Sequence, residues 1–111
     1  MTHSYQYKSN LPLSRRKLNA RFVGKLKNLC GGIYGLHVFE HFANDDDARD
    51  YAYIFIPKSN PKAKAIKSRV LNLCKNYGIG KDFVEVLEGE TGANFDVEGE
   101  YINIYLSEPC N

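Results

Sequence analysis

The chain of 111 residues is 43% hydrophobic and 25% charged, with a formal net charge of +2 at pH 7. This length and composition are typical of one soluble globular domain, residues 1–111, and they exclude a disordered chain. No apolar run approaches the roughly 18 residues of a membrane span and the first residues contain no signal-peptide core, so the sequence predicts a cytoplasmic protein without membrane contact.

The first predicted helix follows an N-terminal arm of residues 1–13 and has its apolar positions between residues 18 and 30. Its apolar positions recur at helical spacing and form one stripe: Leu18, Phe22, Val23, Leu26, Leu29 and Cys30. Ser14 can cap the start of this helix, and Gly31 with Gly32 can end it. We therefore expect the helix to lie with this stripe on an apolar surface.

Each predicted helix is followed by a pair of strands. Side chains alternate with a period of two at residues 36–42 and 51–56, and again at residues 83–88 and 101–106. Polar or glycine-bearing loops separate the two strands of each pair, which is the pattern of a β-hairpin. The loop of the second pair, "GETGANFDVEG", lies between two strands, so it is not a phosphate-binding turn at a helix start.

The second predicted helix lies between the two hairpins. Asn60 is its capping residue, Pro61 suits its first position and Gly78 follows its last turn. Its apolar stripe consists of Ala63, Ile66, Val70, Leu73, Cys74 and Tyr77. This helix is also expected to pack on one apolar surface.

The order α-β-β-α-β-β predicts an α+β two-layer sandwich, in which two amphipathic helices cover one face of a mostly antiparallel four-stranded sheet. The same order occurs in one repeat of the LAGLIDADG homing endonucleases, whose first helix ends on an acid that holds the catalytic metal. The corresponding stretch here, "LCGGIYG", contains no acid. The resemblance is therefore one of topology and carries no function.

Strand alternation divides the side chains of the sheet between two faces. The aliphatic face, expected to receive the helices, consists of Leu36, Val38, Phe42, Ala52, Ile54, Ile56, Val84, Val86, Ile102, Ile104 and Leu106. The aromatic face, expected to contact a partner, includes Phe39, His41, Tyr51, Tyr53, Phe55, Tyr101 and Tyr105. An uncovered aromatic patch of this extent is typical of an interface.

Three uses of the aromatic face remain open. It can contact another protein, including a second copy in a homodimer, or it can stack the bases of single-stranded nucleic acid. In the third case the tyrosines simply keep their hydroxyls in water, or residues 1–13 cover the rings. The acids of the hairpins disfavour the stacking platform because they repel phosphate.

Charge is distributed in blocks along the chain. Residues 1–29 and residues 57–81 each hold seven basic side chains and no acid, whereas residues 82–111 hold eight acids and no base. The side chains expected to bind an anionic partner lie on the two helices: Arg15, Arg16, Lys17, Arg21, Lys25, Lys62, Lys64, Lys67 and Arg69. The start of a helix carries partial positive charge, which repels cations placed there. The basic stretches "SRRK" and "PKAK" at the two helix starts therefore favour the binding of an anion. A solvated lysine-rich surface is the alternative.

The stretch "HVFEHFANDDDARDY" combines histidines and acids without the geometry of a metal site. On a strand His37 and His41 are about 13 Å apart, too far for one metal with ligand bonds of about 2 Å. The acids expected to form a hairpin tip are Asp45, Asp46, Asp47 and Asp50. They lack the alternate spacing and central glycine of a calcium loop. The sequence therefore predicts no metal, no cofactor and no catalytic residue.

These patterns predict a non-catalytic protein that docks its basic helical face on a nucleic-acid or nucleoprotein partner. A second hypothesis is a protein-directed inhibitor or immunity-type protein, similar in size to phage or plasmid antagonists of host defence, which uses acidic hairpin tips and the aromatic face. A third is a small phosphodiester-cleaving enzyme that uses His41 with a tyrosine. Cys30, Cys74 and Cys110 lack a Cys-x-x-Cys spacing and are expected to be reduced thiols.

Overall fold

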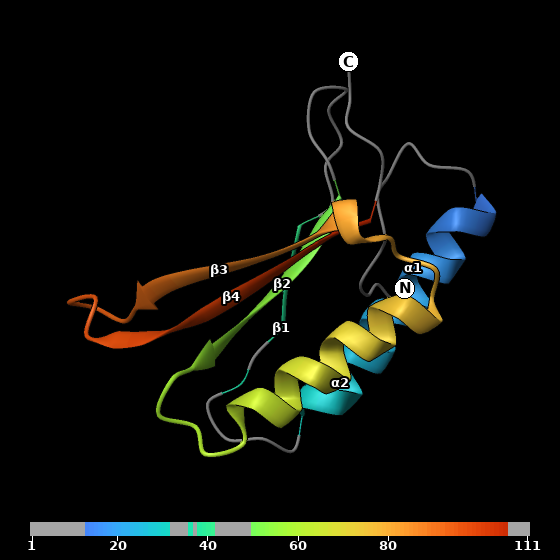
Figure 1. Ribbon diagram of the computed structural model, residues 1–111. Coiled ribbons are helices and arrows are strands. Elements are labelled where there is room, and N and C mark those ends of the chain that lie inside the picture. The colour runs from blue at the N-terminus through green and yellow to red at the C-terminus, as the bar shows by residue number, and fades with distance from the viewer. Residues whose placement is uncertain (1–12, 32–35, 37, 42–49, 107–111) are drawn as a thin grey trace.

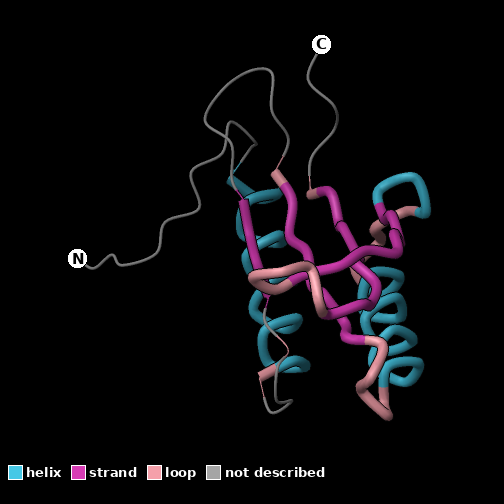
Figure 2. Tube along the Cα trace, turned by 90° about the vertical axis from the view of Figure 1, so that its left-hand side faces the viewer, coloured by secondary structure: helices cyan, strands magenta, loops and turns pink. Residues whose placement is uncertain are grey.

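The computed structural model describes residues 13–31, 36, 38–41 and 50–106. It contains the helices α1 (Leu13–Cys30) and α2 (Ala63–Asn76) and the strands β1 (Val38–His41), β2 (Tyr51–Pro57), β3 (Val84–Thr91) and β4 (Val97–Tyr105), with a short 3-10 turn at Lys81–Phe83. The strands form one antiparallel sheet in the order β1-β2-β4-β3. Both helices lie on the same side of this sheet (Figures 1 and 2). The predicted α+β fold and its element order are therefore confirmed.

The core lies between the helices and the aliphatic face of the sheet. Ile54 and Ile102 face each other across the β2-β4 ladder and are fully buried. Leu26 of α1 and Val70 of α2 are buried to the same extent. The alternation of strand side chains thus places the aliphatic residues beneath the helices, as the sequence predicts, because burial of this apolar area is the main favourable term in folding.

A buried polar contact fixes α1 against the sheet. The side chain of Asn19 is almost inaccessible, and its Nδ2 donates a hydrogen bond of 2.9 Å to the carbonyl oxygen of Leu106, directly after β4. A buried amide without a partner costs about 1–3 kcal/mol, so this bond favours one position of the helix on the sheet. The bond therefore helps to determine which side of α1 packs on the sheet and which side is exposed.

The helix starts differ from those predicted. The helix α1 begins at Leu13, so Ser14 lies within its first turn and not at the cap. Asn60 does use its side chain to accept a hydrogen bond, of 2.9 Å, from the backbone N–H of Lys62. That contact closes a turn, and α2 begins only at Ala63. Gly78 has a φ of 72° and follows the end of α2, as predicted for a residue that must adopt the left-handed region.

The second hairpin is longer than predicted. Strands β3 and β4 pair as far as Thr91 and Val97, beyond the end of the helices in Figure 1. Val86, predicted to lie in the core, faces the helix side but is 37% exposed because the edge strand β3 leads away from the helices there. Val84, at the start of the same strand, is half-buried and packs against the core.

Candidate functional site

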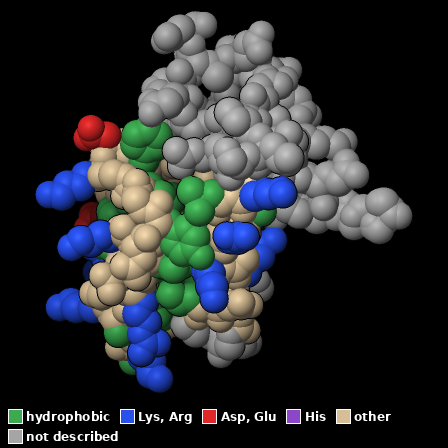
Figure 3. Space-filling view, turned by 90° about the vertical axis from the view of Figure 1, so that its right-hand side faces the viewer, with side chains coloured by type: hydrophobic (Ala, Val, Ile, Leu, Met, Phe, Trp, Pro, Cys, Tyr) green, Lys and Arg blue, Asp and Glu red, His purple; other side chains and the backbone are tan. Residues whose placement is uncertain are grey.

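The charged side chains of the two helices are all cations. Helices α1 and α2 lie side by side, and neither contains an aspartate or a glutamate. Exposed lysines and arginines of the described residues here are Lys17, Arg21, Lys25, Lys27, Lys62, Lys64, Arg69 and Lys75. Figure 3 shows lysine and arginine side chains on both sides of a hydrophobic stripe. We call these eight residues the cationic helical surface.

The spacing of these cations suits a regular polyanion. Lys17, Arg21 and Lys25 follow each other at intervals of four residues on α1. Because a helix rises about 1.5 Å per residue, this row spans roughly 12 Å, along which one strand of duplex nucleic acid carries about three to four phosphates. The row thus presents one cation for almost every phosphate of that length.

The start of α2 is electrostatically unbalanced. Its first turn contains no acid, and its N-cap residue, Lys62, makes no side-chain capping hydrogen bond. The free N–H groups of a helix start carry partial positive charge, to which Lys62 and Lys64 add full charges. The binding of an anion at this end of α2, where it would relieve the repulsion, stays a prediction.

Not every predicted cation belongs to this surface. Lys67 points toward the sheet, where its Nζ lies 3.2 Å from Oε2 of Glu100 in β4. Its charge is therefore partly compensated within the chain. The side chains of Arg15 and Arg16 lie outside the described residues. Conversely, Lys75 and Lys27 belong to the surface although neither was among the expected anion-binding residues; the sequence already places Lys75 on the solvent side of α2, and the absence of acids from α1 is the signal that identifies Lys27.

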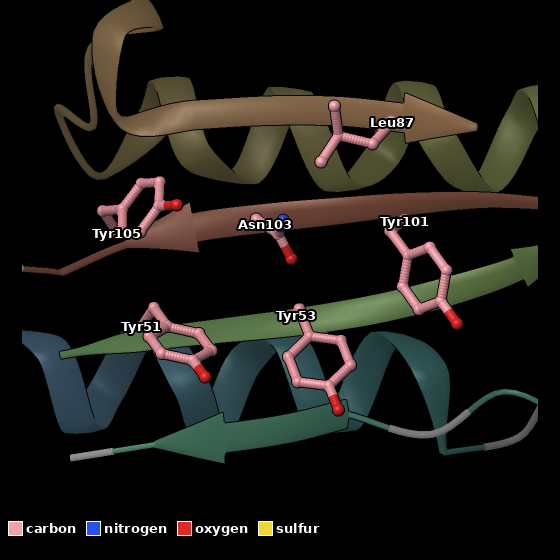
Figure 4. A pocket seen from close by; sticks show the side chains of 6 residues that line it. All are labelled: Tyr51, Tyr53, Leu87, Tyr101, Asn103 and Tyr105. Carbon is pink, nitrogen blue, oxygen red and sulfur yellow. The ribbon is translucent and has the colours of Figure 1, made fainter. Parts of the chain in front are cut away.

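The opposite side of the sheet forms a second surface. The tyrosine face, as we name it, consists of Phe39, Tyr51, Tyr53, Glu85, Leu87, Tyr101, Asn103 and Tyr105. Its centre is a shallow hollow of about 530 Å³, lined by four tyrosines with Leu87 and Asn103. Figure 4 shows the tyrosine rings of β2 and β4 placed around the shorter Asn103 side chain. Strand alternation in the sequence also predicts Leu87 and Asn103 on this face, although neither was among the expected contact residues.

Ring contacts and hydrogen bonds hold the tyrosine face in one arrangement. The rings of Phe39 and Tyr53 stack with centroids 4.9 Å apart and an interplanar angle of 17°. The hydroxyl of Tyr105 donates to Oε1 of Glu85 at 2.7 Å, and that of Tyr101 donates to the carbonyl oxygen of Glu90 at 2.9 Å. Aromatic pairs of this kind add about 0.5–1.5 kcal/mol beyond area burial. The face is thus organised before any partner binds.

Two predicted contact residues do not take part in the described face. Phe55 is buried, because its ring packs 4.7 Å from that of Tyr101 and lies over the strand-paired Gly99. A Cβ atom at Gly99 would overlap the Phe55 ring and the Ile56 carbonyl, so only glycine permits this arrangement. The backbone of His41 pairs with Tyr51, but its side chain lies outside the described residues.

Of the four acids predicted for the hairpin tip, one lies within the described residues. Asp45, Asp46 and Asp47 lie outside the described residues. Asp50 is buried and therefore does not belong to an exposed tip. Its carbonyl oxygen accepts a 2.7 Å hydrogen bond from the N–H of Leu106, a core residue. This bond holds Asp50, directly before β2, next to Leu106, directly after β4.

The hairpin of β3 and β4 carries four glutamates that face each other in pairs across the two strands. Glu88 lies opposite Glu100, and Glu90 lies opposite Glu98. Like charges directly opposite each other destabilise a strand pair by a few tenths of a kcal/mol or more. They line a groove of about 720 Å³ together with Lys58 and Lys64. This groove has a mixed charge lining.

The described residues contain little that favours covalent chemistry. Cys30 and Cys74 are buried free thiols, and burial raises the pKa of Cys30 above its ordinary value and that of Cys74 to about 11. Both thiols are therefore protonated and poor nucleophiles near neutral pH. Within the described part of the chain, no three histidine, cysteine or acidic side chains are grouped for a metal ion.

No described helix has the length and apolar character needed to cross a bilayer. The chain was also compared with protein-family models, curated proteins and solved structures. None of the three comparisons finds a match.

Proposed function

We propose that this protein binds double-stranded nucleic acid through the cationic helical surface. One observation carries the proposal: eight exposed cations cover two adjacent helices that contain no acid. A surface of this kind neutralises phosphates and releases their condensed counterions, which supplies most of the affinity of non-specific binding. Binding is therefore expected to depend weakly on base sequence.

The type of cation favours nucleic acid over an acidic protein. Six of the eight residues of the cationic helical surface are lysines, the other two being Arg21 and Arg69. Lysine is depleted at protein interfaces relative to the rest of the surface. By contrast, lysine and arginine are the side chains that neutralise phosphates in protein–DNA complexes. The composition of the surface therefore agrees better with a phosphate backbone.

The arrangement also favours duplex over single-stranded nucleic acid. Single strands are held by aromatic platforms with cations alongside. The tyrosine face lies on the side of the sheet opposite the helices, and none of its residues is a lysine or an arginine. Bases stacked there would bring their phosphates toward Glu85. The aromatic rings and the cations thus serve different partners.

Salt dependence provides the test of this proposal. If four to five phosphates are neutralised, the logarithm of the association constant for a short fluorescent duplex should fall against the logarithm of salt concentration with a slope of about −4. Affinity would then decrease several-hundred-fold between about 50 and 200 mM salt, measured by fluorescence anisotropy. A slope near zero, or no binding at low salt, would exclude the proposal.

The inhibitor hypothesis keeps one supporting observation, the paired glutamates of β3 and β4. Phosphate mimicry requires several carboxylates in a regular array, and Glu88, Glu90 and Glu98 are exposed. Their groove also contains Lys58 and Lys64, which offset part of this negative charge. We therefore keep inhibition as the second candidate, favoured if the duplex does not bind. Nuclease activity has less support because the side chain of His41, on which that hypothesis depends, lies outside the described residues.

A further inference from the structure

The tyrosine face combines exposed apolar area with an almost complete lack of charge. Phe39 at one sheet edge is 46% exposed, and Leu87 at the other is 48% exposed. Between them lie tyrosines and Asn103, and Glu85 is the one charged side chain among the described residues of the face. A partner for this surface must therefore be apolar, able to accept tyrosine hydroxyls, and without many carboxylates of its own. A second copy of the same face meets these requirements.

The extent of the face agrees with a weak but specific dimer. The four strands lie about 4.8 Å apart; β1 has 4 residues and the other three have 7 to 9, so the face covers at most roughly 19 Å by 23 Å. That projection is on the order of 400 Å², and side-chain relief makes the accessible area larger. Two such faces approach the lower limit of specific interfaces, about 1,200 Å² in total. We therefore expect a dissociation constant in the micromolar range.

We infer that two copies of this chain pack their tyrosine faces together about a twofold axis that runs parallel to the strands between β2 and β4. Sheets that pack face to face keep their strand directions within about 30° of each other. A twofold axis in this position places β1 of one copy over β3 of the other, and β2 over β4. Each copy then covers the face that its own helices leave open.

The single carboxylate of the face selects this axis. Phe39, Tyr53, Asn103 and Glu85 form one row across the four strands, because each is paired with the next in the sheet register. An axis across the strands would place Glu85 against Glu85 of the other copy, with repulsion in a partly desolvated interface. The axis along the strands instead places Glu85 over Phe39 of the other copy. The two carboxylates then lie at opposite edges of the interface.

Shape supports the same packing. The stacked rings of Phe39 and Tyr53 form one half of the face, and the hollow above Asn103 forms the other half. About the proposed axis, Tyr53 of each copy lies over Asn103 of the other, so the ring enters the hollow. Its hydroxyl can then meet the Asn103 amide. A ridge and a hollow on the two halves of one surface make that surface self-complementary, as a twofold interface requires.

This dimer extends the proposed function, on which the following step rests. The helices lie on the side of the sheet away from the tyrosine face, so the two cationic helical surfaces of the dimer point in opposite directions (Figure 1). Each can bind a separate duplex segment. The dimer is thus expected to bridge two segments of nucleic acid, whereas a monomer binds only one.

The first experiment measures mass in the absence of nucleic acid. We expect light scattering to give twice the chain mass at concentrations of hundreds of micromolar. Phe39→Glu should yield the monomer mass, because it places a carboxylate against Glu85 of the other copy. Phe95→Glu is the matched control: Phe95 is an exposed aromatic in the β3-β4 turn, outside the tyrosine face, and its replacement should leave the dimer intact.

A compensating variant tests the axis itself. Phe39→Glu combined with Glu85→Lys should restore the dimer mass, because each new glutamate lies over a new lysine of the other copy. Within one chain these two positions are three strand spacings, about 14 Å, apart, so a pair inside one chain cannot account for the recovery. A wild-type monomer, or a dimer that persists in Phe39→Glu, would overturn the interface. A double variant that stays monomeric would overturn the proposed axis.

The second experiment separates the dimer from the proposed function. Two short duplexes, one with a donor and one with an acceptor fluorophore, should show energy transfer with the wild-type protein. Phe39→Glu should bind one labelled duplex through its unchanged helices but give no energy transfer. Bridging by the monomeric variant would refute the role of the tyrosine face. A stable dimer without affinity for duplex would refute the proposed function and leave the dimer standing.

Discussion

Replacing Arg21 and Lys25 together by glutamate is expected to weaken duplex binding by roughly 50- to 100-fold at about 0.1 M salt. Each neutralised phosphate multiplies the association constant by about (1/[salt]) to the power 0.9, with the salt concentration in M. At about 0.1 M salt this factor is roughly eightfold. Loss of two contacts therefore gives about 60-fold, and repulsion by the new carboxylates adds to it. The slope of log affinity against log salt should become less steep by about two units.

The control for this variant changes the net charge of the protein by the same amount, at two positions outside the helices. Lys58 and Lys81 are exposed and lie outside both helices, in the turns before α2 and before β3. Their joint replacement by glutamate changes the long-range field as much as the helical variant does. We expect it to reduce affinity only a few-fold. Equal losses in the two variants would mean that net charge, and not the cationic helical surface, determines binding.

Replacing Leu26 by alanine is expected to lower the free energy of unfolding by about 2–5 kcal/mol. Leu26 has no exposed area and contributes to the core between α1 and the sheet. Removal of a buried leucine side chain loses its transfer free energy and leaves a cavity that relaxes only in part. Because domains of this size are stable by only about 5–15 kcal/mol, the variant should lose a large share of its stability. Urea denaturation followed by circular dichroism measures this loss.

A second leucine on the same helix provides the matched control. Leu18 belongs to the predicted apolar stripe, but it is 36% exposed. Its replacement by alanine removes the same atoms without opening an enclosed cavity, so the expected loss is below about 1 kcal/mol. Similar losses for Leu18→Ala and Leu26→Ala would contradict the position of the core beneath α1.

The sequence predicts this fold well wherever local periodicity coincides with burial. Alternation in β2 and β4 places Ile54 and Ile102 toward the helices and Tyr53 toward the opposite face. The glycine at 78 correctly marks the end of α2. These features are predictable because the period of the backbone alone decides which side chains share a face.

The errors arise where pairing or tertiary contact overrides local preference. Glu90 and Glu98 are poor strand formers, so the sequence placed them in a loop, yet the ladder continues through both. Asp50 was assigned to an acidic tip because its neighbours are acids, whereas it is buried and its carbonyl oxygen accepts a hydrogen bond from the N–H of Leu106. Neither contact is encoded within a few residues of the position concerned.

The candidate surfaces were predicted less completely than the fold. An acid-free helix identifies cations such as Lys25, but it does not reveal that Lys67 turns toward Glu100 of the sheet. Likewise, strand alternation gathers the tyrosines, whereas the hollow above Asn103 follows from the packing of neighbouring rings. Contacts between elements distant in sequence determine both features, so they require the folded chain.

The most direct test of the central proposal is to map the contacts of a short DNA duplex on the isotope-labelled protein by NMR. We expect the largest chemical-shift changes at the backbone amides of α1 and α2, near Arg21, Lys25 and Lys64. Amides of β4 around Asn103, on the tyrosine face, should change little. Shifts concentrated on β2 and β4, with α1 and α2 unaffected, would contradict nucleic-acid binding through the cationic helical surface.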